Sequence, residues 1–162
     1  MATFKIDSSE FDEPIYYLIA IHSRIEMYRL AFFINQNINI NLFRSAQDLN
    51  FSTKKGMAHF MHFEFEDKEK DLKFDLIQNK SNIEISSNLA QNDLFATTQN
   101  SFFIPTYLMP DFKKVDFFLK IEVNESPLDL DEMVSKIKLI PEVSTVYAID
   151  SNTIKSKYNL IF

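Results

Sequence analysis

Two parts of the chain show a strand pattern followed by a helical pattern, and the first of them begins at residue 15. Residues 15–21 form a short, continuous apolar run, which is typical of a central strand buried on both faces of a sheet. Beyond it, apolar residues recur every three or four positions and predict an amphipathic helix that ends in the Asn-rich stretch 35–41. Between them lies a capping-box sequence, so we expect the Ser23 hydroxyl and the Glu26 carboxylate to mark the start of this helix. The apolar stripe of the helix consists of Met27, Leu30, Ala31, Ile34 and Ile38.

The last third of the chain repeats this order. Apolar residues alternate over 115–123 and predict a strand. Ser126 and Pro127 then predict the start of a second helix, which Pro141 ends. A returning strand follows at 143–149, and strand–helix–strand with short links is a crossover unit that we expect to be right-handed.

The middle of the chain has the pattern of an antiparallel hairpin. Apolar and polar residues alternate over 57–66 and again over 72–76, with a short charged loop between them. This pairing would place Lys73 across from Glu64 or Glu66.

The stretch 81–101 is polar and poorly periodic, so it predicts a loop with one weak strand near 83–85. Taken together, the patterns predict one α+β domain over residues 1–162. It would have a mainly antiparallel sheet, two helices packed on one face, and ferredoxin-like character in the second half. A chain of this length buries enough surface to fold without a disulfide or a metal.

Residues 158–162, Tyr-Asn-Leu-Ile-Phe, form an apolar tail. Leaving such side chains in water forgoes roughly 1.5–3 kcal/mol each. We therefore expect the tail to dock on its own domain, beside the first helix or as an edge strand, with Lys155 and Lys157 in solvent. The alternative is a short peptide that captures a partner protein.

Composition excludes several kinds of chemistry. The chain has one glycine, Gly56, so it contains neither a P-loop nor a G-x-G-x-x-G turn, and its lack of cysteine excludes thiol chemistry. The net charge of −6 disfavours nucleic-acid binding, which depends on Lys and Arg neutralising phosphates. The sequence shows no signal peptide and no membrane-length apolar run, and zero cysteines fit a reducing compartment, so we expect a cytoplasmic protein without a membrane span.

The histidines offer two candidates for chemistry. His62, Glu64 and Glu66 share one strand face and could supply three ligands to zinc, but we interpret them as a solvent-facing charged strand and expect no metal or other cofactor. His22 lies at a strand end beside Ser23, although neighbouring side chains on a strand point to opposite faces. We interpret His22 as structural, expect no catalytic residues, and predict that the protein is not an enzyme.

Aromatic residues suggest binding instead. Tyr28, Phe32 and Phe33 lie outside the single apolar stripe of the first helix, so this helix should be covered on a second side by the rest of the chain or by a partner. Our hypothesis is a non-catalytic, intracellular protein-interaction module with a protein partner or a homodimer. The alternative is an RNA-binding module in which Phe60 and Phe118, on otherwise polar strand faces, stack with bases. Helix cover over that face would explain the same two residues.

Three segments together resemble the IPExxDY family of small bacterial proteins, which has no assigned activity. They are residues 28–35 (YRLAFFIN), 109–121 (MPDFKKVDFFLKI) and 155–162 (KSKYNLIF). The triplet Ile140-Pro141-Glu142 is also present, without Asp-Tyr after it. The resemblance implies a compact intracellular protein and assigns no functional residue.

Overall fold

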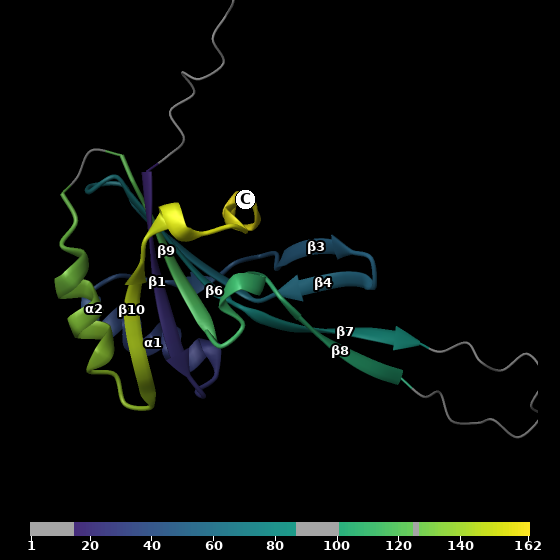
Figure 1. Ribbon diagram of the computed structural model, residues 1–162. Helices are drawn as coiled ribbons and strands as arrows, with labels where there is room; N and C mark the ends of the chain where they lie inside the picture. Colours follow the sequence, from purple (N-terminus) through teal and green to yellow (C-terminus); the bar gives the residue numbers. More distant parts are fainter. Residues whose placement is uncertain (1–14, 87–100, 125–126) are drawn as a thin grey trace, which may run out of the picture.

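The fold is built on a six-stranded sheet (Figure 1). The computed structural model describes residues 15–86, 101–124 and 127–162. The strand order is β10-β1-β9-β6-β5-β2, and every neighbouring pair is antiparallel. The strands of this sheet are β1 (Ile15–Ser23), β2 (Phe43–Arg44), β5 (His62–Asp67), β6 (Leu72–Gln78), β9 (Phe117–Val123) and β10 (Val143–Ile149).

Two helices, α1 (Met27–Ile38) and α2 (Leu130–Lys138), cover one face of this sheet. They join alternate residues of the strands in one apolar core, which explains why the strands carry a period of two and the helices a period of three to four. The predicted stripe of α1 is buried at Met27, Leu30, Ala31 and Ile34. The predicted α+β class, with a mainly antiparallel sheet and both helices on one face, is confirmed.

The ferredoxin-like character extends beyond the second half of the chain. In the order of the sequence, β1, α1, β6, β9, α2 and β10 form the core, and its strands lie side by side as β10-β1-β9-β6. This is the arrangement of a split β-α-β unit, in which β1 lies between the two strands that α2 connects. The remaining elements are additions to this core.

The other face of the sheet is covered by hairpins and by the C-terminal segment. Its cover packs around a second apolar core that includes Leu18, Phe60, Phe118 and Leu160. In Figure 1 the hairpin of β7 and β8 projects away from the sheet, with the hairpin of β3 and β4 beside its inner part. The elements on this side are β3 (Leu49–Thr53), β4 (Gly56–Phe60), β7 (Lys80–Ser86), β8 (Ser101–Tyr107) and the 3-10 turns η1 (Pro110–Phe112), η2 (Ser151–Thr153) and η3 (Lys157–Leu160).

Two predictions for the middle of the chain are wrong. The alternating run 57–66 is not one strand, because it breaks at Met61 and its two halves pair in different sheets, as β4 and β5. The weak strand predicted near 83–85 is confirmed within β7, but the predicted loop 81–101 is wrong at both of its ends, because β7 spans residues 80–86 and residue 101 opens β8. The backbones of β7 and β8 pair with each other, so the polar composition of these strands does not prevent their pairing.

The single glycine lies where these two hairpins meet. Gly56 has φ of +140°, a conformation that L-residues rarely adopt, and a Cβ placed there would lie 2.9 Å from Cγ2 of Ile83. Ile83 on β7 is buried in the second core. The absence of a side chain at position 56 therefore lets β4 approach β7 closely.

The start of α1 differs from the predicted capping box. The N-cap residue is Glu26, and its side chain makes no capping hydrogen bond. The Ser23 hydroxyl instead donates to the carbonyl of Glu142 at 3.0 Å and accepts from the N–H of Ile25 at 3.3 Å. Ser23 still belongs to β1, so its hydroxyl ties the end of the strand to the turn before β10.

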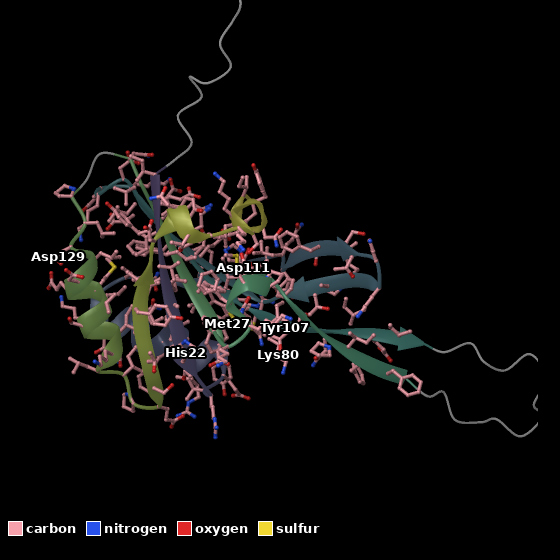
Figure 2. All side chains as sticks on the ribbon, in the orientation of Figure 1. His22, Met27, Lys80, Tyr107, Asp111 and Asp129 are labelled. Carbon is pink, nitrogen blue, oxygen red and sulfur yellow. The ribbon has the colours of Figure 1, made fainter. Side chains whose placement is uncertain are left out.

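The second helix begins at a different residue from the one predicted. Ser126 lies outside the described residues, and the N-cap is Asp129, at the upper end of α2 in Figure 2. The Asp129 carboxylate accepts a hydrogen bond from the N–H of Glu132 at 2.9 Å. An aspartate is among the preferred residues for this position because its oxygen satisfies an otherwise unpaired helix amide.

The C-terminal segment lies on the sheet face opposite α1. It forms a 3-10 turn, so the predicted positions beside the first helix or as an edge strand are both wrong. Leu160 is 1% exposed and packs into the second core, whereas Ile161 is 69% exposed. The Asn159 amide donates to the carbonyl of Leu108 at 2.7 Å. Lys155 is exposed and Lys157 is half-buried.

Candidate functional site

The three aromatic residues singled out on α1 have different environments. Tyr28 and Phe32 are 60% and 56% exposed, and they lie one helical turn apart. Phe33 is half-buried against the core on the helix side of the sheet, and its ring meets that of Phe32 edge-on, with centroids 5.6 Å apart. The chain itself therefore covers Phe33 in part, and leaves Tyr28 and Phe32 largely open among the described residues. We call these three residues the α1 aromatic surface.

A cleft of about 590 Å³ lies beside Tyr28 at the start of α1. Met27, which Figure 2 labels, lines it together with Met61 and Phe117, while Lys80 and Asp116 add charges. The cleft combines apolar side chains with groups that can form hydrogen bonds. It can accept an apolar side chain surrounded by polar neighbours.

The hydroxyl of Tyr28 interacts with Glu26. The hydrogen bond to the Glu26 side chain and the negative charge of that carboxylate raise the pKa of Tyr28 above its ordinary value. Tyr28 therefore stays a neutral phenol at physiological pH. It offers an apolar ring with a polar tip.

His22 and Ser23 do not form a catalytic pair. His22 lies on β1 near its end (Figure 2), and its Nε2 is 3.4 Å from the hydroxyl of Tyr147, whose ring stacks on it. The Ser23 hydroxyl bonds to backbone groups, as described above. His59 is exposed and its Nδ1 lies 2.5 Å from Oδ1 of Asn50.

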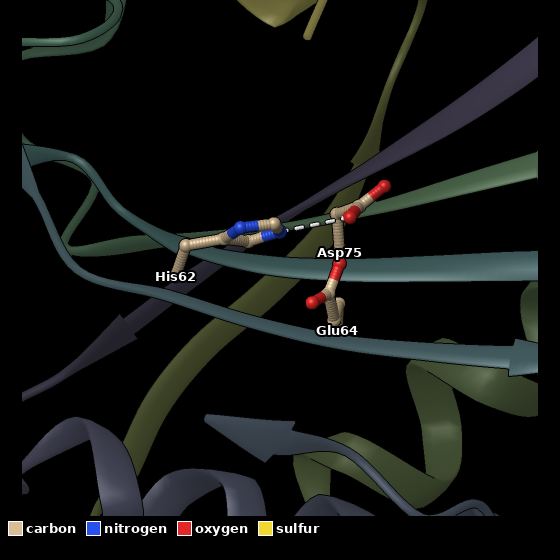
Figure 3. Close-up of side chains that lie close together, drawn as sticks. All are labelled: His62, Glu64 and Asp75. Carbon is tan, nitrogen blue, oxygen red and sulfur yellow. Dashed lines mark hydrogen bonds and ion pairs between the residues drawn. The ribbon is translucent and has the colours of Figure 1, made fainter. Parts of the chain in front are cut away.

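A second polar group lies beneath the C-terminal segment, on β5 and β6. Figure 3 shows the imidazole of His62 and the carboxylates of Asp75 and Glu64 drawn together, with His62 Nε2 at 2.8 Å from Asp75 Oδ1. His62 is 4% exposed and Asp75 is fully buried. The sequence-based interpretation of a solvent-facing strand is therefore wrong for His62. Glu66, the third residue of that predicted set, is exposed and lies outside this group.

Two lysines border the group. The ammonium of Lys73 lies 3.5 Å from Oδ2 of Asp75. Lys120 is 3% exposed, and its ammonium donates to Oε1 of Glu122 at 2.5 Å and to the carbonyl of Leu160 at 2.8 Å. The buried ammonium thus connects the centre of the sheet to the C-terminal segment.

The ring of Phe162 covers the group. Its centroid is 4.7 Å from the ammonium of Lys120, 5.9 Å from that of Lys73, and 5.4 Å from the imidazole centroid of His62. Aromatic faces attract cations at such distances. The C-terminal segment therefore packs against the buried His62 ring and at the same time interacts with the positive charges of the two lysines. We call His62, Glu64, Asp75, Lys73 and the Phe162 ring the covered polar site.

Sequence analysis missed Asp75 and Lys120. Each lies on the same sheet face as His62 and has a second charged residue two positions away, Lys73 or Glu122, and such a charged pair within an apolar strand is the signal that could have found them. In the observed register Asp75 lies directly across from Glu64 on one side and from Lys120 on the other. The sequence does not state which strands are neighbours, so it could not bring these residues together.

The aromatic residues of the RNA-binding alternative are not accessible. Phe60 and Phe118 are buried in the second core, beneath hairpins and 3-10 turns rather than beneath a helix. They cannot stack with bases in this structure. An RNA site would have to use other rings, such as the exposed Phe102 and Phe103 of β8.

Comparisons with known proteins give no relative. No protein-family model matches the chain, and neither a search of curated proteins nor a search of solved structures finds a match. The relation to the IPExxDY family therefore stays a prediction from the sequence. Among the described residues, no helix is both long and apolar enough to span a membrane.

Proposed function

We propose that this chain is a non-catalytic protein-interaction module of the cytoplasm that binds a partner protein through the α1 aromatic surface. The observation that carries the proposal is the exposure of Tyr28 and Phe32, at 60% and 56%, one turn apart on α1. The helix itself is anchored, since four residues of its other face are buried in the core.

The energetics favour such a use. Burying one aromatic side chain in an interface stabilises it by roughly 1.5–3 kcal/mol, and aromatic residues are enriched among those that contribute most to binding. Tyr28 and Phe32 also lie on a helix that is already folded, so binding a partner costs no conformational entropy for ordering this backbone. The adjacent cleft at Met27 and Met61 would receive an apolar side chain of the partner.

The non-catalytic part of the proposal draws on the histidine contacts. Within the described ranges, His22 contacts a tyrosine, His59 an asparagine, and His62 an aspartate together with the Phe162 ring. Among the described residues, none of these rings contacts a serine or threonine hydroxyl, and the one hydroxyl contact, from His22 Nε2 to Tyr147, is long at 3.4 Å. We therefore assign binding, and not turnover, to the exposed surface.

Site-specific photo-crosslinking in the source cells tests the proposal. A photoreactive phenylalanine analogue at position 32 should give one discrete crosslinked product, and Tyr28→Ser should abolish it. The same analogue at Leu139, which is more exposed than Phe32 but lies after α2, is the matched control. A product of twice the chain mass would identify a second copy as the partner.

Two results would contradict the proposal. One is the absence of any product specific to position 32, together with a monomer in light scattering. The other is a product that Tyr28→Ser leaves unchanged. Loss of folding is not expected to confuse the outcome, because Tyr28 and Phe32 are both largely exposed and truncating them should hardly change the melting temperature.

A further inference from the structure

We infer that His62, Glu64 and Asp75 bind a divalent transition-metal ion of the Zn²⁺ type, and that Lys73 occupies the place of this ion in the metal-free protein. The inference concerns the sheet face opposite α1 and does not depend on the proposed partner binding. It rests on ligand geometry, on an unexplained pair of like charges, and on the charge balance of the covered polar site.

The ligand geometry comes first. One nitrogen of His62 and one carboxylate oxygen each of Glu64 and Asp75 lie within 4.8 Å of one another. Zinc bonds to imidazole nitrogen and carboxylate oxygen at about 2.0–2.2 Å, and three protein ligands leave a fourth position open. A small closure of the partly exposed Glu64 side chain would bring its oxygen to bonding distance. The two other ligands are adjacent, with 2.8 Å between His62 Nε2 and Asp75 Oδ1, and a bound metal ion would replace the proton that now lies between them and move the two atoms slightly apart.

The like charges provide the independent observation. Glu64 and Asp75 are direct partners in the register of β5 and β6, and two carboxylates facing each other across a ladder destabilise it. Asp75 is fully buried, and its Oδ2 has no hydrogen-bond partner among the described residues, where its ion pair is with the Lys73 ammonium at 3.5 Å. The Glu64 side chain forms no hydrogen bond or ion pair with the described residues. A cation held between the two carboxylates would account for both facts.

Charge balance argues for a divalent ion and for the role of Lys73. The carboxylates around the covered part of this face are those of Glu64, Asp75 and Glu122, and the ammonium groups are those of Lys73 and Lys120. Glu66 lies on the same face across from Lys73 but is exposed to solvent. Lys120 is held by two hydrogen bonds, whereas the side chain of Lys73 is 35% exposed and lies 3.5 Å from Asp75 Oδ2. If Lys73 turns to solvent, three negative charges face one positive charge, which leaves room for an ion of charge +2.

Titration of the full chain with Zn²⁺ tests the inference. Binding is measured by the rise in melting temperature and by competition with a chromogenic chelator. Zinc should stabilise the wild type in a concentration-dependent manner, because it binds only the folded site. Glu64→Gln should weaken binding by at least about 10–100-fold, the loss that removal of even an outer-shell partner causes. Glu66→Gln, a change of the same kind two residues along the same strand, should leave binding unchanged.

Two further variants distinguish the site from other causes. Lys73→Met should tighten zinc binding, because it removes the internal competitor, and His59→Asn should have no effect, because it removes only an exposed histidine. Glu64→Gln should also keep or raise the stability of the metal-free protein by relieving the like-charge pair, so a folding defect is not expected. The inference is overturned if zinc gives no stabilisation, if Glu64→Gln and Glu66→Gln bind it equally, or if Lys73→Met binds it no better than wild type.

Discussion

A side chain at Gly56 would strain both the backbone and the packing around it. Gly56→Ala would place a methyl group 2.9 Å from Ile83 Cγ2 on a backbone with φ of +140°. We expect this substitution to lower the free energy of unfolding by about 1–3 kcal/mol, the usual cost of overpacking, measured by urea denaturation.

The cost at Gly56 has two physical parts, and a double-mutant cycle separates them. Combining Gly56→Ala with Ile83→Ala removes the steric contact but keeps the unfavourable φ. If the two substitutions prove additive, the contact with Ile83 contributes nothing and backbone strain alone is responsible.

Tyr28 carries a prediction about pH. Glu26 raises the pKa of Tyr28, since ionisation would break their hydrogen bond and place two negative charges side by side. Glu26→Gln removes the charge, so the pKa of Tyr28 should fall toward the ordinary tyrosine value. An ultraviolet absorbance titration above pH 9, with Tyr28→Phe to identify the signal, measures it. An unchanged titration in Glu26→Gln would rule out this interaction.

The contacts of Lys73 show which side-chain pairs the sequence can predict and which it cannot. It predicted Lys73 across from Glu64 or Glu66, and the register does place Glu66 there. The carboxylate that the Lys73 ammonium approaches is nevertheless that of Asp75, on its own strand. Side chains two apart on a strand share a face, but which pair meets depends on what covers that face, and no local pattern contains this information.

Among the elements, the C-terminal turn offers a matched pair of adjacent residues. Leu160→Ala should destabilise the protein by about 2–5 kcal/mol, because Leu160 fills the second core, whereas Ile161→Ala should have almost no effect. Melting curves of the two variants provide the measurement. Equal effects would mean that the segment detaches from the sheet in solution.

The elements with strong periodicity were predicted well, and those with weak periodicity were not. The predicted return strand 143–149 matches β10, and the stripe of α1 is buried as expected. The hairpins on the opposite face were missed or divided wrongly, since β8 carries exposed aromatic residues and β7 alternates around one buried isoleucine. Their strands are specified by mutual pairing, which is a tertiary property.

For the whole molecule, the arrangement predicts a gradient of local stability. β1 and β9 are central and buried on both faces, while β8 lies in the projecting hairpin and is largely exposed. Hydrogen exchange should therefore be slowest at amides of residues 18–21 and 117–121, and much faster in β8. Comparable protection of β8 and β1 would show that the hairpin is held by contacts beyond those described.

The central position of β1 has a consequence for biosynthesis. Its two neighbours, β9 and β10, are translated about a hundred or more residues later, so β1 has no partner on either edge while most of the chain is being made. At a synthesis rate of roughly 5–20 residues per second, this interval lasts on the order of ten seconds. During that time an apolar strand with open edges is available to other nascent chains. We therefore expect the yield of folded protein in cells to depend on translation speed and on chaperones that shield residues 15–23.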